Sequence, residues 1–111
     1  MSYAQLEIEV VRWAEARGIV KNSTPLAQAI KTTEEVAELL AALSRGDTDE
    51  AKDAYGDILV TLIIGCACLD VNLTNCLETA YEQIKHRRGY LGADGVFIKE
   101  TPAQALKRKL A

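Results

Sequence analysis

Two long segments with helical patterning, residues 25–45 and 49–69, constrain the fold most strongly. Thr24 followed by Pro25 offers an N-cap with proline at the first helical position. Asp47 and Glu50 have the spacing of a second capping pair. Because only the turn around Gly46 separates the two segments, we expect two long helices that pack antiparallel.

Two further helices are expected on either side of this pair. Ser2 and Gln5 form a capping box for a helix over residues 3–17, which Gly18 ends. Asn72 or Thr74 caps a fourth helix that runs through Arg88 and is ended by Gly89, with basic residues in its last turn. The pattern predicts an all-α, four-helix-bundle-like fold.

The sequence changes character after Gly89. Glycines recur at 89, 92 and 95, a short extended apolar run covers 96–98, and Thr101 with Pro102 begins a basic terminal helix. No segment alternates for long enough to predict a sheet. We therefore expect a flexible C-terminal arm after the bundle.

Composition excludes several classes of protein. The net charge of −3 over 111 residues lacks the excess of positive charge that is typical of nucleic-acid-binding domains, so no nucleic-acid partner is expected. The apolar run Ile58–Leu69 is shorter than the roughly 20 residues that span a bilayer, so no membrane partner is expected.

Cys66, Cys68 and Cys76 suit reduced thiols in a helical core. A cytoplasmic protein is the expectation.

Polar residues gather on one face of the segment 25–45. At 100° per residue, Gln28, Lys31, Glu35 and Glu38 share an arc of about 80°, and Glu34 lies beside it. The neighbouring sector is apolar. This placement suits a cleft between helices.

The segment 49–69 carries a matching acidic stripe formed by Glu50, Asp53 and Asp57, which leads into its apolar part. Like charges at this spacing repel one another, so both stripes require a counter-charge. Mg²⁺ or Mn²⁺ meets that need, because hard cations take carboxylate oxygens. A solvated face rich in Glu and Lys explains the same pattern, and the pattern alone leaves both interpretations open.

Four blocks in order carry a family resemblance. They read QxxKxxEExxEL from Gln28, DxxGDIL from Asp53, YxxIKxRRG from Tyr81 and GVFxKE from Gly95. Over roughly residues 10–100 the chain resembles the MazG-like family of all-α nucleoside triphosphate pyrophosphohydrolases, most closely its short single-domain members, many of them encoded by phages or prophages.

The resemblance implies a helical bundle over residues 1–100, with residues 101–111 as a C-terminal helical tail. It implies assembly as a homodimer or a dimer of dimers. It also implies Mg²⁺-dependent cleavage of NTP or dNTP between the α and β phosphates, which yields the monophosphate and pyrophosphate. Mn²⁺ is a possible substitute for Mg²⁺.

The same resemblance implies that Glu35, Glu38 and Asp57 bind the metal. The family has a further acid three residues before the position of Asp57, where this chain has Ala54. Asp53 lies one helical turn from Asp57 and is the candidate replacement.

Glu34 is the candidate catalytic base, because a carboxylate that does not bind the metal can accept a proton from water. Lys31 is either a phosphate contact or a salt-bridge partner that holds Glu35. The candidate substrate-binding residues are Gln28, Lys31, Lys85, Arg87, Arg88 and Lys99.

Three hypotheses about function remain open from the sequence. The first is a pyrophosphohydrolase that removes noncanonical triphosphates or controls nucleotide pools. The second keeps the fold and changes the substrate to dUTP or phosphoribosyl-ATP, which relatives hydrolyse. The third is a catalytically silent helical module for interaction or nucleotide sensing, in which Ala54 has cost metal binding.

Overall fold

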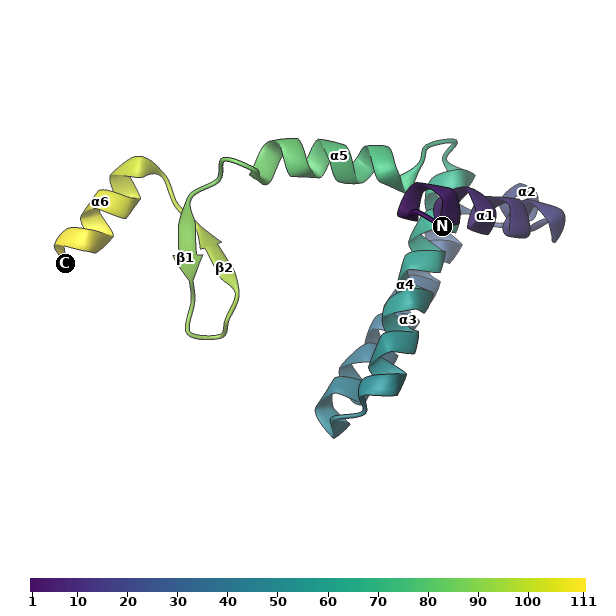
Figure 1. Ribbon diagram of the computed structural model, residues 1–111, viewed down its shortest axis with the longest axis horizontal. Coiled ribbons are helices and arrows are strands. Elements are labelled where there is room, and N and C mark those ends of the chain that lie inside the picture. Colours follow the sequence, from purple (N-terminus) through teal and green to yellow (C-terminus); the bar gives the residue numbers. More distant parts are fainter. The chain divides into compact units, whose positions relative to one another are not determined.

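The computed structural model describes residues 1–111, and the chain divides into two compact units, Met1–Cys76 and Leu77–Ala111. The prediction of a nearly all-helical protein is confirmed. The helices are α1 (Tyr3–Ala16), α2 (Ile19–Asn22), α3 (Pro25–Arg45), α4 (Thr48–Cys68), α5 (Leu73–Ile84) and α6 (Pro102–Leu110), and the strands are β1 (Gly89–Leu91) and β2 (Phe97–Lys99) (Figure 1).

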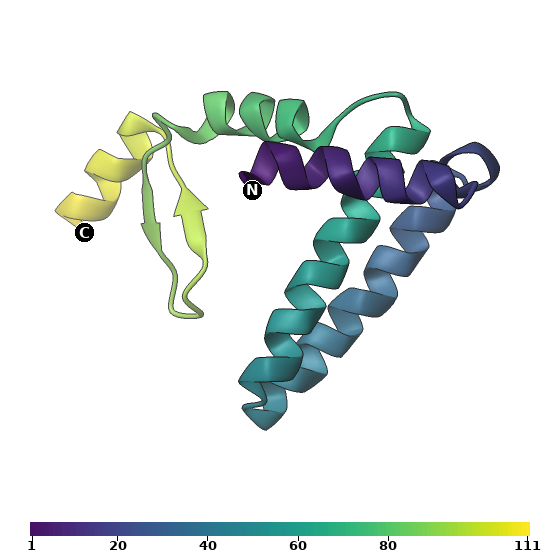
Figure 2. The ribbon, with the colours of Figure 1, turned by 45° about the vertical axis from the view of Figure 1, so that its right-hand side comes forward.

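The N-terminal unit is built on the antiparallel pair of α3 and α4, which lie side by side along their length (Figure 2). The predicted caps form. The Thr24 hydroxyl accepts a hydrogen bond from the Ala27 N–H at 3.0 Å, and the Asp47 carboxylate accepts one from the Glu50 N–H at 3.1 Å. Gly46 ends α3 with a φ of 70°, which glycine adopts without strain. Helices α1 and α2 pack against α4.

Small side chains make up most of the buried core of this unit. The buried apolar residues are Ala14, Ala42, Ala51, Ala54, Ile63 and Ile64. Alanines let the backbones of α3 and α4 approach closely, but they bury little apolar area. Several leucines of the same two helices stay exposed, among them Leu40 at 60% and Leu59 at 40%. The apolar content of α3 and α4 therefore exceeds what one chain buries.

Polar contacts tie the helices of this unit together. The hydroxyls of Thr32 on α3 and Thr61 on α4 lie 2.7 Å apart. The buried Glu7 of α1 accepts hydrogen bonds from the backbone N–H and the hydroxyl of Thr74, at 3.2 and 2.7 Å. These bonds link α1 to the first turn of α5.

Helix α5 ends at Ile84, so the prediction that it runs through Arg88 is wrong. The Arg87 N–H closes a turn on the Ile84 carbonyl at 2.9 Å, and the Arg88 carbonyl accepts from the Glu100 N–H at 3.0 Å. The backbone of Arg88 thus already pairs with the chain leaving β2. Arg87 and Arg88 lie beyond the helix rather than in its last turn.

Residues 89–99 form an antiparallel β-hairpin, a short strand pair that the sequence pattern does not predict. Gly89 lies opposite Lys99, and a Cβ added at Gly89 would lie 2.1 Å from the Ile98 carbonyl oxygen. Gly95 turns the chain at a φ of +83°. Gly89 therefore allows the two strands to lie close together, and Gly95 allows the turn between them.

The terminal helix begins as predicted. Thr101 and Gln104 form a capping box at the start of α6. Arg108 on α6 binds the Glu100 carboxylate at 2.8 Å and lies over the ring of Tyr90 at 4.6 Å. These contacts hold α6 against the hairpin. No single helix of the chain is both long enough and apolar enough to cross a membrane.

Candidate functional site

Acidic side chains from α3 and α4 influence one another electrostatically. Glu38 lies nearly one turn after Glu35 on α3, and Asp57 lies one turn after Asp53 on α4. The pKa of Glu38 is raised, chiefly because a protonated Glu38 can donate a hydrogen bond to Glu35 and because the charge of Glu35 opposes ionisation, with Asp57 contributing. The pKa of Asp57 is raised by burial, then by the charges of Asp53 and Glu35. The charges of Glu35, Glu38, Asp53 and Asp57 therefore reach one another, and we refer to these four residues as the acidic cluster.

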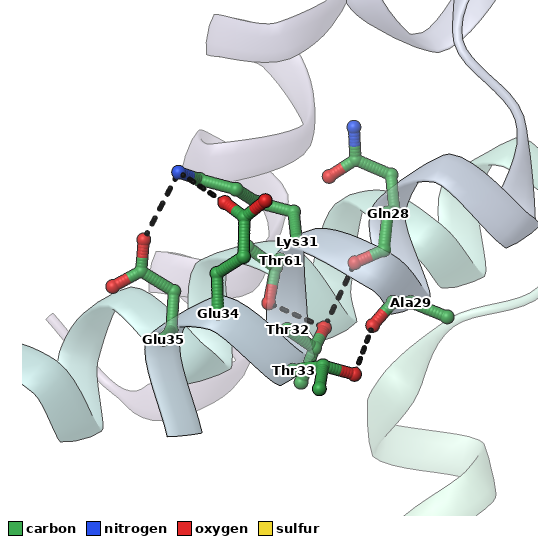
Figure 3. A network of polar contacts seen from close by, with 8 residues as sticks. All are labelled: Gln28, Ala29, Lys31, Thr32, Thr33, Glu34, Glu35 and Thr61. Atoms are coloured by element: carbon green, nitrogen blue, oxygen red, sulfur yellow. Dashed lines mark hydrogen bonds and ion pairs between the residues drawn. The ribbon is translucent and has the colours of Figure 1, made fainter. Parts of the chain in front are cut away.

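Glu35 is the buried member of this cluster, with 7% of its surface exposed. Its Oε2 is buried and has no hydrogen-bond partner. Its Oε1 faces the Lys31 ammonium at 3.5 Å (Figure 3). A buried carboxylate oxygen without a partner costs free energy unless a proton or cation reaches it. Binding of a proton or a cation at Glu35 Oε2 would therefore be favourable.

Lys31 joins the two glutamates that follow it on α3. Its Nζ lies 3.2 Å from Glu34 Oε2 as well as 3.5 Å from Glu35 (Figure 3). Glu34 is mostly exposed, so its carboxylate meets water while Lys31 orients it. The side chain of Gln28, near the start of α3, donates to the Ser23 hydroxyl at 3.0 Å and forms no hydrogen bond with the acids.

The donor set fits a hard divalent cation by its chemistry. It offers carboxylate oxygens only, one of them buried and unpartnered, and two of its acids have raised pKa values. No three His, Cys, Asp or Glu side chains are already arranged to coordinate a metal. Cation binding at Glu35, Glu38, Asp53 and Asp57 therefore requires side-chain adjustment. Ala54 is buried and offers no ligand.

The predicted phosphate-binding cations of the C-terminal unit are only partly brought together. Arg87, Arg88 and Lys99 line one open pocket of about 770 Å³, and none of them forms an ion pair with a carboxylate. Lys85 instead pairs with Glu82 at 2.6 Å and is not among the lining residues. The carboxylate in the pocket wall, Glu100, is already bound by Arg108.

Sequence reasoning missed His86, which also lines this pocket. It had no recognisable catalytic setting in the sequence, and the hairpin that folds the chain back beside it was not predicted. Its position between Lys85 and Arg87 in a basic run was the available signal. With His86, four basic side chains that can donate hydrogen bonds to anions line the pocket.

We expect divalent cations to stabilise the protein most at neutral pH. Folding raises the pKa values of Glu38 and Asp57, so stability falls as pH rises from their ordinary values through the raised ones. At neutral pH the repulsion is fully present, and a cation relieves it. At ten times its Kd, Mn²⁺ should add about 1.4 kcal/mol, a rise in Tm of roughly 5–10 °C. Thermal unfolding with and without Mn²⁺ at pH 7.5 and pH 4.5 measures this, and equal shifts at both values would contradict it.

Comparison with known proteins finds similarity to a phage protein. An uncharacterised 18.2 kDa protein from the rep-hol intergenic region of Haemophilus phage HP1 is 40% identical over 60 residues, which cover 54% of this chain and 37% of the phage protein. This chain thus matches well under half of that relative's length. No solved structure matches the chain.

The family model for phosphoribosyl-ATP pyrophosphohydrolase matches residues 19–83. This range contains all the candidate metal ligands, Glu34 and Lys31. It ends at Gln83, the first residue that lines the pocket of the C-terminal unit, and so leaves out the basic residues of this basic pocket. The resemblance to MazG-like pyrophosphohydrolases is confirmed, and the chain belongs to the phosphoribosyl-ATP pyrophosphohydrolase family.

Proposed function

We propose that this protein is a Mg²⁺-dependent nucleotide pyrophosphohydrolase that cleaves NTP or dNTP between the α and β phosphates. The observation that carries the proposal is the buried, unpartnered Oε2 of Glu35 inside an acidic cluster. A surface face rich in Glu and Lys has no reason to bury a carboxylate without a partner. The family match over the same residues supports a pyrophosphohydrolase.

Glu35, Glu38, Asp53 and Asp57 are the proposed ligands of Mg²⁺, with Mn²⁺ as a substitute. A cation bound there supplies neutralisation of phosphate charge and a more acidic water. Glu34 is the proposed base: its carboxylate is exposed to water and is oriented by Lys31 at 3.2 Å. The proton of the attacking water passes to Glu34, and the new oxygen–phosphorus bond forms as pyrophosphate leaves.

Arg87, Arg88 and Lys99 are the proposed phosphate-binding residues of the C-terminal unit. Arginine grips phosphate with two parallel hydrogen bonds, and the two arginines and Lys99 line one pocket without carboxylate partners. Lys85 joins them only if it leaves Glu82. Gln28 and Lys31 on α3 are proposed separately, as substrate-binding residues of the N-terminal unit.

The proposed partners are the nucleotide and a second copy of this chain. Large apolar side chains of α3 and α4 stay exposed in a single chain, including Leu40, Leu43 and Leu59. A homodimer or homotetramer would cover them. No nucleic-acid or membrane partner is proposed.

Two classes of nucleotide are the candidate substrates. Noncanonical or surplus triphosphates suit a house-cleaning role or the control of nucleotide pools. Phosphoribosyl-ATP is the second candidate, because the matching family is described by that substrate.

A substrate panel tests the proposal. The full chain is incubated with the common NTPs and dNTPs, dUTP, oxidised analogues and phosphoribosyl-ATP, with Mg²⁺ or Mn²⁺, and products are resolved by chromatography. We expect a monophosphate and pyrophosphate from at least one nucleotide, and no product with EDTA. Survival of every substrate by a folded protein would favour the catalytically silent module.

A further inference from the structure

Lys31 is the only cation that forms an ion pair with the acidic cluster. Its Nζ lies 3.5 Å from Glu35 Oε1, whereas Glu38, Asp53 and Asp57 form no ion pair. Lys31 also pairs with Glu34, and the remaining ion pairs of the chain involve none of these residues. In the protein without bound metal, Lys31 is therefore the counter-charge of the buried Glu35 carboxylate (Figure 3).

The charge of Lys31 also acts on the other acids. It lowers the pKa values of Glu38 and Asp57 and so opposes the increase that the neighbouring carboxylates cause. In turn Glu34, and then Glu35, raise the pKa of Lys31. Lys31 therefore stays protonated throughout the neutral range and serves as the positive charge for more than its direct partners.

Lys31 leaves the negative charge of the cluster only partly balanced. Glu35 Oε2 has no partner although Oε1 faces the ammonium. A divalent cation that binds the Glu35 carboxylate brings two positive charges to a place where Lys31 already holds one. Like charges a few ångströms apart repel one another even in bulk water, and more strongly beside a buried group. Lys31 and the cation therefore compete for Glu35.

We propose that Lys31 is a positioning residue that holds Glu35 before the cation arrives and is released from it when the cation binds. The released ammonium then becomes available to the phosphates of the substrate. This inference rests on the proposed function, since it needs a cation at Glu35. Because linkage is reciprocal, it follows that Lys31 weakens cation binding in the absence of nucleotide.

Mn²⁺ binding without nucleotide tests the proposal on the full-length chain. Free Mn²⁺ is measured by electron paramagnetic resonance during titration of wild type, Lys31→Met and Lys52→Met. Lys52 is an exposed lysine of α4 beside Asp53 and forms no ion pair, so its loss removes the same charge near the cluster. Glu38→Ala shows which part of the binding belongs to the cluster.

We expect Lys31→Met to bind Mn²⁺ about fivefold more tightly than wild type, and Lys52→Met to change the affinity by less than about twofold. Lys31→Arg, which keeps the charge, should bind like wild type. A merely structural lysine would not raise the affinity when lost. If Glu38-dependent binding is present but Lys31→Met binds no more tightly than Lys52→Met, the competition is refuted and the proposed function stands. If no binding depends on Glu38, both fail.

Discussion

Replacing Glu35 with glutamine is expected to raise the Tm of the metal-free protein at neutral pH and to lower pyrophosphohydrolase activity at least about 100-fold. The gain in stability follows because the charge of Glu35 raises the pKa values of both Glu38 and Asp57. Glutamine keeps the shape of the side chain and removes this repulsion. The substitution also removes the ion pair with Lys31. Because this pair is partly exposed, its loss costs less free energy than the removed repulsion returns.

The loss of activity follows from the proposed role of Glu35 as a metal ligand. Changing residues that merely orient a metal ligand already costs 10–100-fold, so changing a ligand should cost at least as much. Thermal unfolding and pyrophosphate release measure the two effects. Glu15→Gln, an exposed glutamate of α1 without an ion pair, is the matched control and should change neither. Activity of Glu35→Gln within threefold of wild type would contradict the assignment.

Gly89→Ala is expected to disrupt the C-terminal hairpin. The new methyl group would lie 2.1 Å from the Ile98 carbonyl oxygen and 2.5 Å from the Phe97 ring, so the strands must separate. Overpacking of this kind costs about 1–3 kcal/mol. We expect amide hydrogen exchange over residues 89–99 to become about 10–100-fold faster, with residues 25–68 unaffected.

The matched control for this substitution is Gly56→Ala. Gly56 lies in α4, and an added Cβ there meets no atom within 4 Å. Alanine in a helix interior should stabilise the protein by about 0.5–1 kcal/mol. Unchanged exchange in the hairpin of Gly89→Ala would show that the strands tolerate a side chain. If the basic pocket binds phosphate, Gly89→Ala should also raise the KM for nucleotide.

The long helices were predictable because their signals are local. Thr24, Pro25 and Asp47 mark helix starts by their own chemistry, and the structure begins α3 at Pro25 as predicted. The hairpin was not predictable in the same way. Its strands are only three residues each, and the requirement for Gly89 arises from its contact with Ile98, which the sequence does not display.

The same distinction between local signals and tertiary contacts applies to the candidate site. Helical spacing alone placed Lys31, Glu35 and Glu38 on one arc, and their electrostatic effects on one another agree with that arc. Which carboxylate oxygen is buried without a partner depends on the packing of α3 against α4, and no periodicity reveals it. The pairing of Lys85 with Glu82 likewise depends on side-chain geometry rather than on spacing alone. The roles of these residues remain predictions.

The most direct test of the proposed reaction compares pyrophosphate with orthophosphate released by wild type and Glu38→Ala. The metal-free proteins are given the best nucleotide of the panel, and Mn²⁺ is then added stepwise. We expect wild type to release one pyrophosphate per monophosphate formed, only after Mn²⁺ is added, and Glu38→Ala to release at least about 100-fold less. Release of orthophosphate in place of pyrophosphate, or full activity in Glu38→Ala, would contradict it.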